Sequence, residues 1–144
     1  MRLPNFLILL LAVALFSCDE DSIQPGPEGR YNGTTDQGEP VTFRIEEIND
    51  ELFITSYSIT ILYAVGGGNT ETEVIAESNA NGLGELDNKA FTIYQNSEQS
   101  YPIQGFQESN RMISGTYILK ALLMQDDQPE VVSGTFRATK VDQD

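Results

Sequence analysis

The sequence predicts an all-β fold, an antiparallel β-sandwich of about eight strands. From residue 30 to residue 140, apolar and polar residues alternate with a period close to two, which is typical of half-buried strands. Clusters of Gly, Asn, Asp and Ser separate the alternating runs and mark turns. The connections are also short, which suits antiparallel hairpins, because parallel strands need long crossovers.

The strands follow from this alternation in chain order. Val41, Phe43 and Ile45 alternate with polar residues, as one face of a half-buried strand does. The same pattern runs through Leu52–Val65 and then through shorter segments. The expected strands are Arg30–Thr35, Val41–Glu46, Leu52–Val65, Glu71–Glu77, Lys89–Gln95, Ser100–Gln107, Arg111–Leu122 and Val131–Lys140. The expected turns are Asp36–Gly38, Asn49–Asp50, Gly66–Asn69, Asn96–Ser97, Ser109–Asn110 and Gln125–Pro129.

A small lipocalin-like β-barrel is the alternative architecture. Leu52–Val65 is long for a sandwich strand and suits a strand that bends from one sheet to the other. Gly115 and Gly134 would suit the corners of a barrel. In this alternative, the residues expected to line an apolar interior are Tyr57, Ile59, Ile61 and Tyr63.

A weak internal repeat supports the β assignment. Ile113–Tyr117 and Val132–Phe136 share an apolar-Ser-Gly-Thr-aromatic pattern, and Tyr31–Thr35 is a looser third copy. In each copy the glycine lies on the face of the apolar residues, because positions two apart point the same way. We expect it to permit a bend, or to let a neighbouring aromatic ring lie across the backbone. The repeats resemble the glycine–aromatic strands of small secreted β-domains in bacterial lipoproteins, a resemblance that implies no site.

The first residues have the layout of a secretory signal peptide. Arg2 supplies a positive charge, and Phe6–Phe16 is an uncharged apolar run. This run is too short to cross a hydrocarbon core about 30 Å thick as a helix. Leu15-Phe16-Ser17-Cys18 then ends the segment on the only cysteine of the chain.

Leu15, Ser17 and Cys18 resemble the lipobox of bacterial lipoproteins, although Phe16 is untypical at its position. The resemblance implies cleavage before Cys18 and acylation of its thiol, which anchors the protein to the membrane. Asp19–Asp21 resembles the export tags of surface lipoproteins in some diderm bacteria. We therefore expect a cell-envelope protein, lipid-anchored to the outer membrane and exposed at the surface. The expected organisation is 1–17 signal peptide, 18–29 acidic and Pro-Gly tether, and 30–144 one all-β domain.

The composition excludes several function classes. The chain has no histidine and no tryptophan, so the commonest general base and transition-metal ligand is missing. With Cys18 acylated, no thiol nucleophile remains either. Acidic residues number 22 against eight basic ones, for a formal charge of −14, which disfavours nucleic acid and anionic lipid as partners. We expect no enzyme activity, no catalytic residue, no cofactor and no metal site.

Two weaker patterns have a plainer interpretation. Glu77–Asn88 resembles the start of a calcium loop, with oxygen ligands at alternate positions before Gly82, but it ends on Asn88 where a bidentate Glu is required. We interpret it as a polar loop. The acid pairs Asp126–Asp127 and Glu46–Glu47 are sequence neighbours and do not supply the two separated carboxylates that glycoside hydrolysis needs.

The sequence thus predicts a non-catalytic binding or interaction module on the envelope. In this hypothesis Tyr94 and Tyr101 present flat rings to a glycan or a partner protein. Two alternatives stay open: a barrel that carries a small apolar ligand, and a structural or accessory subunit without a small-molecule ligand.

Overall fold

The computed structural model describes residues 26–65, 67–78, 81–121 and 130–142. The expected signal peptide, Cys18 and the Asp126–Asp127 pair lie outside these residues.

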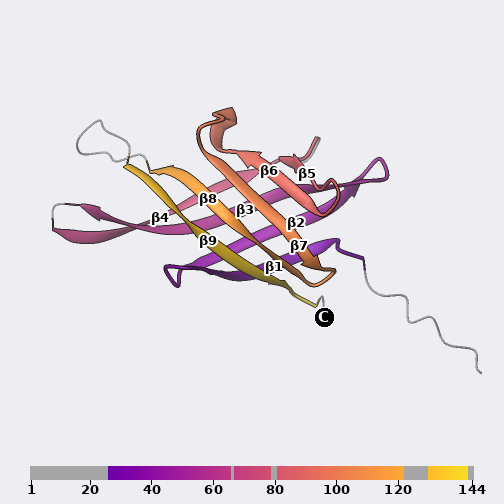
Figure 1. Cartoon of the computed structure of the whole chain (residues 1–144), viewed down its shortest axis with the longest axis horizontal. Coiled ribbons are helices and arrows are strands. Elements are labelled where there is room, and N and C mark those ends of the chain that lie inside the picture. Colours follow the sequence, from indigo (N-terminus) through magenta and orange to yellow (C-terminus); the bar gives the residue numbers. More distant parts are fainter. Residues whose placement is uncertain (1–25, 66, 79–80, 122–129, 143–144) are drawn as a thin grey trace, which may run out of the picture.

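Nine antiparallel strands form one hydrogen-bonded sheet (Figure 1). They are β1 Gly29–Thr35, β2 Pro40–Ile48, β3 Glu51–Val65, β4 Gly68–Glu77, β5 Gly84–Glu85, β6 Ala90–Tyr94, β7 Pro102–Ser109, β8 Met112–Ala121 and β9 Glu130–Lys140, with a 3₁₀ turn, η1, at Gln95–Ser97. The spatial order is β4-β3-β2-β1-β9-β8-β7-β6, and β5 pairs with β3 beyond the end of β4. The predicted all-β antiparallel fold is confirmed.

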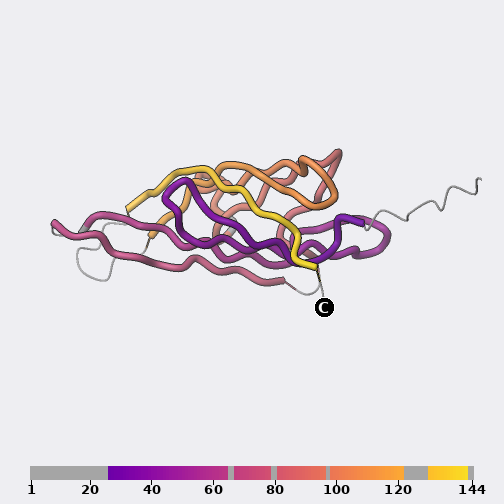
Figure 2. The backbone as a smooth tube through the Cα atoms, turned by 90° about the horizontal axis from the view of Figure 1, so that it is seen from below, coloured from indigo at the N-terminus to yellow at the C-terminus, as the bar shows by residue number. Residues whose placement is uncertain are grey.

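The sheet curls into a half-barrel, so its two halves face each other across the core. Figure 2 shows the layer of β1 to β4 against the layer of β6 to β8. Because β1 pairs with β9, both layers belong to one continuous sheet rather than to two separately bonded sheets. The core therefore lies between two layers, as in a sandwich, but one wall joins them, as in a barrel.

Aromatic rings fill the middle of this core. The Phe43 ring centroid lies 4.8 Å from that of Phe136, 5.8 Å from that of Phe91 and 6.4 Å from that of Tyr57. These four residues come from both layers and are buried. In a fold without disulfides, the burial of large apolar side chains from two layers is the main contribution to the free energy of folding.

The long strand β3 contains a β-bulge, which shifts by one residue the positions whose side chains face the core. Arg44 of β2 pairs with Ser56 and the next residue, Ile45, pairs with Ile54, so Thr55 is the extra residue on β3. Ile54 points into the core on one side of the bulge, and Tyr57 does so on the other. A bulge bends the strand and increases its twist, which helps the sheet to curl.

The glycine–aromatic repeats pack against each other. In the β8–β9 ladder Tyr117 pairs with Gly134, and Gly115 pairs with Phe136. The ring of each repeat lies over the glycine of the other: a Cβ on Gly134 would be 2.5 Å from the Tyr117 hydroxyl, and one on Gly115 would be 2.7 Å from Cζ of Phe136. For these two copies the prediction that a ring lies across the glycine backbone is confirmed, whereas a Cβ on Gly33 of the looser third copy would meet the backbone of Arg137 and Ala138.

The expected turns among the described residues lie close to their predicted places, whereas Gln125–Pro129 and Gly66 lie outside the described residues. Asn49 and Asp50 form the two-residue β2–β3 turn, both with positive φ, as a tight hairpin requires. Lys89 also has positive φ and belongs to a turn, so β6 begins at Ala90, one residue later than predicted.

The strands define two ends of the domain. At the near end, β1 and β8 begin and β9 finishes; at the far end, β1 and β8 finish and β6 leads into η1. A strand of ten residues such as β8 spans about 33 Å, which separates the two ends. Within the described part of the chain, no helix is both long and apolar enough to span a membrane.

Candidate functional site

The residues expected to line a barrel interior lie in the packed core. Tyr57 is 3% exposed, and Ile59 and Ile61 are fully buried. Tyr63 is partly buried and packs against the same cluster. Burial raises the pKa of the Tyr57 hydroxyl, because the phenolate would lose its hydration. These side chains project from one face of β3 into the core, toward the opposite layer.

The loop that resembles a calcium site contains structure of its own. Gly84 and Glu85 form β5 on the edge of β3, and Leu86 is buried in the core. Gly82 has a φ of 68°, and a Cβ at this position would be 2.6 Å from the Phe53 ring. Its close packing on Phe53 therefore accounts for the glycine. Asn79 lies outside the described residues, and no group of three or more acidic or thiol side chains among the described residues could hold a metal ion.

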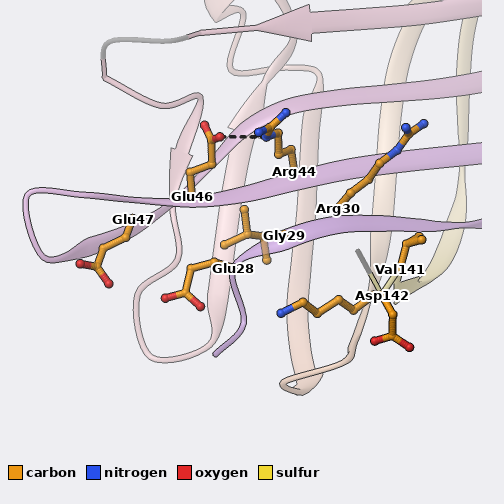
Figure 3. Close-up of a pocket in the computed structure, with 10 residues that line it drawn as sticks. Glu28, Gly29, Arg30, Arg44, Glu46, Glu47, Val141 and Asp142 are labelled. Carbon is orange, nitrogen blue, oxygen red and sulfur yellow. Dashed lines mark ion pairs between the residues drawn. The ribbon is translucent and has the colours of Figure 1, made fainter. Parts of the chain in front are cut away.

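The acid pair Glu46–Glu47 lies on β2. Adjacent residues of a strand point to opposite faces, so the two carboxylates diverge (Figure 3). Glu46 forms an ion pair with Arg44, with 2.8 Å between Oε1 and Nε. This pair does not form the facing carboxylates of a glycosidase site.

The two predicted tyrosines lie together at the far end. Tyr94 ends β6 and pairs with Pro102, and the Gln95 backbone amide donates to the Tyr101 carbonyl (3.1 Å). The Tyr94 side chain is 43% exposed. The Lys120 ammonium lies 5.4 Å from the Tyr101 ring centroid, a cation–π contact, and 3.8 Å from a Glu98 carboxylate oxygen.

Val131 adds an apolar side chain to this surface. It pairs with Lys120 in the β8–β9 ladder and is 52% exposed. Tyr94, Tyr101, Lys120 and Val131 are referred to below as the far-end patch.

Gln95 holds the far-end patch in place. Its side-chain amide donates to the Lys120 carbonyl (3.1 Å) and accepts from the Lys120 backbone N–H (2.7 Å). The buried amide thus pairs with β8 as a neighbouring strand would. Because both groups of the Gln95 amide are used, η1 is fixed to β8, and the two tyrosines that flank η1 are fixed with it.

A second candidate site is an open groove of about 700 Å³ at the near end (Figure 3). Its charged lining residues come from the start of β1, from the end of β2 and from the end of β9 and the residues after it. They are Glu28, Arg30, Arg44, Glu46, Glu47, Lys140 and Asp142. This set is referred to below as the near-end groove.

The chain that enters β1 forms one wall of the near-end groove. The Lys140 ammonium donates to the Gly26 carbonyl (2.7 Å). The Tyr31 hydroxyl donates to the Pro27 carbonyl (2.6 Å), and the Asn110 carbonyl is 3.0 Å away. Burial, together with the nearby Glu28 carboxylate, raises the pKa of Tyr31 to about 12, and the Arg111 guanidinium opposes this shift. These contacts hold residues 26–28 against the body of the domain.

Sequence reasoning did not find the near-end groove. Arg30 and Arg44 are far apart in the chain and meet only because the β1–β2 hairpin pairs them directly. The turn at Asp36–Gly38 was the available signal, since a hairpin closed there puts Arg30 opposite Arg44.

Comparison with protein families, curated proteins and solved structures found no match for this chain.

Proposed function

We propose that this protein is a lipid-anchored lipoprotein of the bacterial cell envelope whose β domain is a non-catalytic binding module. The acylated residue is Cys18, and the far-end patch is the surface that meets the partner. The observation that carries the proposal is the position of the far-end patch. It lies at the end of the domain opposite to the start of β1, where the tether joins.

This arrangement suits display at a membrane. The tether from Cys18 reaches the domain at Gly29, at the near end. The far-end patch lies about 33 Å further out along the strands, at the end directed away from the lipid anchor. A partner in solution or on another cell would meet this end first.

The chemistry of the far-end patch favours a protein partner over a glycan. The Lys120 ammonium already covers the Tyr101 ring, leaving Tyr94 as the more exposed ring of the pair. Tyr94 and Val131 together present an aromatic and an aliphatic surface beside one charge, a composition common in protein–protein interfaces. A sugar-binding platform normally relies on several free ring faces, and the chain has no tryptophan.

A carrier of a small apolar ligand is the second candidate, because the sheet curls into a half-barrel. The full burial of Ile59 and Ile61 within the core supports the first candidate over this one. Mass spectrometry of the native protein from its envelope would favour the carrier if a stoichiometric lipid-sized mass remained bound.

The anchor is tested by metabolic labelling with an alkyne analogue of palmitate in a diderm host. We expect label on the full chain and none on Cys18→Ala, which should also leave the membrane fraction. Equal labelling of both chains, or none on either, would refute the anchor.

The docking surface is tested by photocrosslinking in cells. A photoreactive amino acid is placed at Tyr94 and, as a matched control, at Ile75, which is 64% exposed on the outer face of β4. We expect a discrete protein adduct from position 94 alone. Adducts of equal yield from both positions, or a glycan array signal that Tyr94→Ala abolishes, would reject the protein-docking assignment.

A further inference from the structure

The outer face of β7, β8 and β9 carries little charge, although the chain has a formal charge of −14. Two rows of outward-facing residues cross its middle. In one row Gln104, Thr116 and Thr135 lie side by side, and in the next row Phe106, Ser114 and Arg137 do so. These six residues are referred to below as the neutral face. Its one charged residue, Arg137, is paired with the Glu108 carboxylate (3.0 Å), so the neutral face and Glu108 together have no net charge.

Acidic residues lie on the outside of the opposite layer. Glu71, Glu73 and Glu77 are exposed on β4, and they point outward because the residues between them pack toward the core. Figure 2 shows this layer on the other side of the core from β7 and β8. A large net charge keeps identical chains apart. Two copies therefore approach one another most easily through a surface that is locally neutral.

Exposed apolar side chains lie on the neutral face and beside it. Phe106 is 50% exposed, and Tyr94 on β6 and Val131 on β9 are exposed on the same side of the sheet. Among the described residues, these are three of the five large hydrophobic residues that are exposed. The core of a protein–protein interface is poor in charged residues and rich in aromatic ones. The composition of this side of the sheet is therefore that of a docking surface.

The two rows are self-complementary under a two-fold axis that runs along β8. Such an axis lays β7 of one copy over β9 of the other, since these strands are the two neighbours of β8. Phe106 then faces Arg137 of the second copy, because both residues belong to the row of Ser114. A guanidinium group over an aromatic ring forms a favourable cation–π contact. The symmetry forms this contact twice.

We propose that the neutral face binds a second copy of this chain, side by side on one membrane. The membrane part rests on the anchor proposed above, which places the near end of the domain toward the lipid. An axis along the strands keeps both near ends at the same level, so both tethers reach the same membrane.

The size of the contact predicts a reversible dimer. Three neighbouring strands about 4.8 Å apart form a strip about 15 Å wide. Such a strip is smaller than the interface of an obligate dimer, which buries roughly 2,000 Å² or more. Anchoring both copies in one membrane raises their effective concentration and so favours the dimer.

Sedimentation equilibrium tests self-association. All buried core residues lie between Tyr31 and Ala138, so the chain from Asp19 onward retains the complete core. This chain is studied at concentrations up to about 1 mM, which detects a dissociation constant of that size. We expect a monomer–dimer equilibrium that favours the dimer more as salt is added, because salt screens the repulsion between two chains of like net charge. A chain that stays monomeric throughout, or a dimer that salt weakens, would overturn the proposal.

Matched variants locate the contact. Phe106→Glu should raise the dissociation constant of the dimer at least tenfold, whereas the control Ile75→Glu makes a similar change at an exposed position of β4 and should associate like the parent. Arg137→Gln should weaken the dimer at least fivefold. Its control is Arg44→Gln, which removes another exposed, ion-paired arginine. Unfolding midpoints verify that each variant folds. Equal dissociation constants for Phe106→Glu and the parent would overturn the assignment.

Photocrosslinking of the full chain in cells identifies the occupant. A photoreactive amino acid is placed at Thr116, which lies on the proposed axis and therefore faces its own copy. We expect an adduct of twice the mass of the chain from position 116 and none from position 75. An adduct between position 116 and a different protein would overturn the second copy as the occupant.

The dimer and the proposed function fail in different ways. The chain from Asp19 onward lacks Cys18, so its association in solution does not depend on acylation. Failed palmitate labelling would refute the anchor and not the contact between two copies. A monomeric chain would refute the dimer and not the anchor or the far-end patch.

Discussion

Tyr117 lies across Gly134: the two residues are partners in the β8–β9 ladder, and the ring occupies the space of the missing side chain. Phe136 lies across Gly115 in the same way, two residues along. The two copies of the sequence repeat are thus one structural device, in which each glycine makes room for the ring of the other strand.

Gly134→Ala should destabilise the domain because the new methyl group meets the Tyr117 ring and an Asp36 carboxylate oxygen. Inserting a carbon into a packed site costs about 1–3 kcal/mol. Urea denaturation would show a lower midpoint, while the neighbouring exposed Ser133→Ala should differ little from the parent. Coincident curves for Gly134→Ala and the parent would mean that the ring does not need this space.

Gln95→Ala should cost about 1–3 kcal/mol, because it leaves the backbone N–H and carbonyl of Lys120 without partners in a buried site. Gln37 provides a matched comparison: its amide makes the same two bonds with the backbone of Leu62, both 3.0 Å, but in an exposed place. Water can replace the Gln37 amide, so Gln37→Ala should cost less. Chemical denaturation of both variants measures the difference, and a larger loss for Gln37→Ala would contradict it.

Thr55→Val should leave the free energy of unfolding unchanged or raise it. The Thr55 hydroxyl is buried at the β3 bulge and has no hydrogen-bond partner among the described residues. Replacing an unsatisfied polar group by an apolar group of the same shape removes a desolvation cost of about 1–3 kcal/mol. The exposed Thr139→Val serves as the control in thermal unfolding. A clear loss of stability in Thr55→Val alone would indicate that the hydroxyl has a partner.

The stability of the domain should fall in alkaline solution. Tyr31 has a pKa of about 12 in the folded state against 10.0 as a free side chain, so its folded form holds the proton more tightly. The contribution of this pKa shift to the free energy of unfolding is complete below pH 10. It is lost as the pH rises from 10 toward 12, and its size is on the order of 2 kcal/mol.

Tyr31→Phe tests this contribution. The slope of unfolding free energy against pH between 10 and 11.5 should become shallower in the variant. Burial also raises the pKa of Tyr57 and of Tyr117, so part of the decline should remain. An identical slope in parent and variant would show that Tyr31 does not contribute to the loss of stability in alkaline solution.

Much of the fold followed from the alternation of side chains. The eight predicted strands correspond to the eight long strands, because alternation reports directly which residues face the core. The aromatic rings over Gly115 and Gly134 were also predictable, since the two repeats contain their own complementary residues. Strand β5 was not predicted, because two residues are too few to show a period.

The candidate sites likewise include features that the sequence predicted and features that it did not. Tyr94 and Tyr101 were predicted to present flat rings, and the structure places them on either side of η1, where the Gln95 amide donates to the Tyr101 carbonyl. The sequence did not predict that the Lys120 ammonium covers the Tyr101 ring. Lys120 lies on β8, and the hydrogen bonds between its backbone and the Gln95 side chain bring it beside η1.

The sequence by itself determined the all-β class, the strand positions and the acidic surface, because these depend on local periodicity and composition. The tertiary structure alone decided that one sheet curls around the core, and that Arg30 and Arg44 meet in a groove with Glu28. The physical reason is that sheet closure and the groove both depend on strand register. Register is set by packing across the core and by hairpin geometry, and alternation along a single strand does not report it.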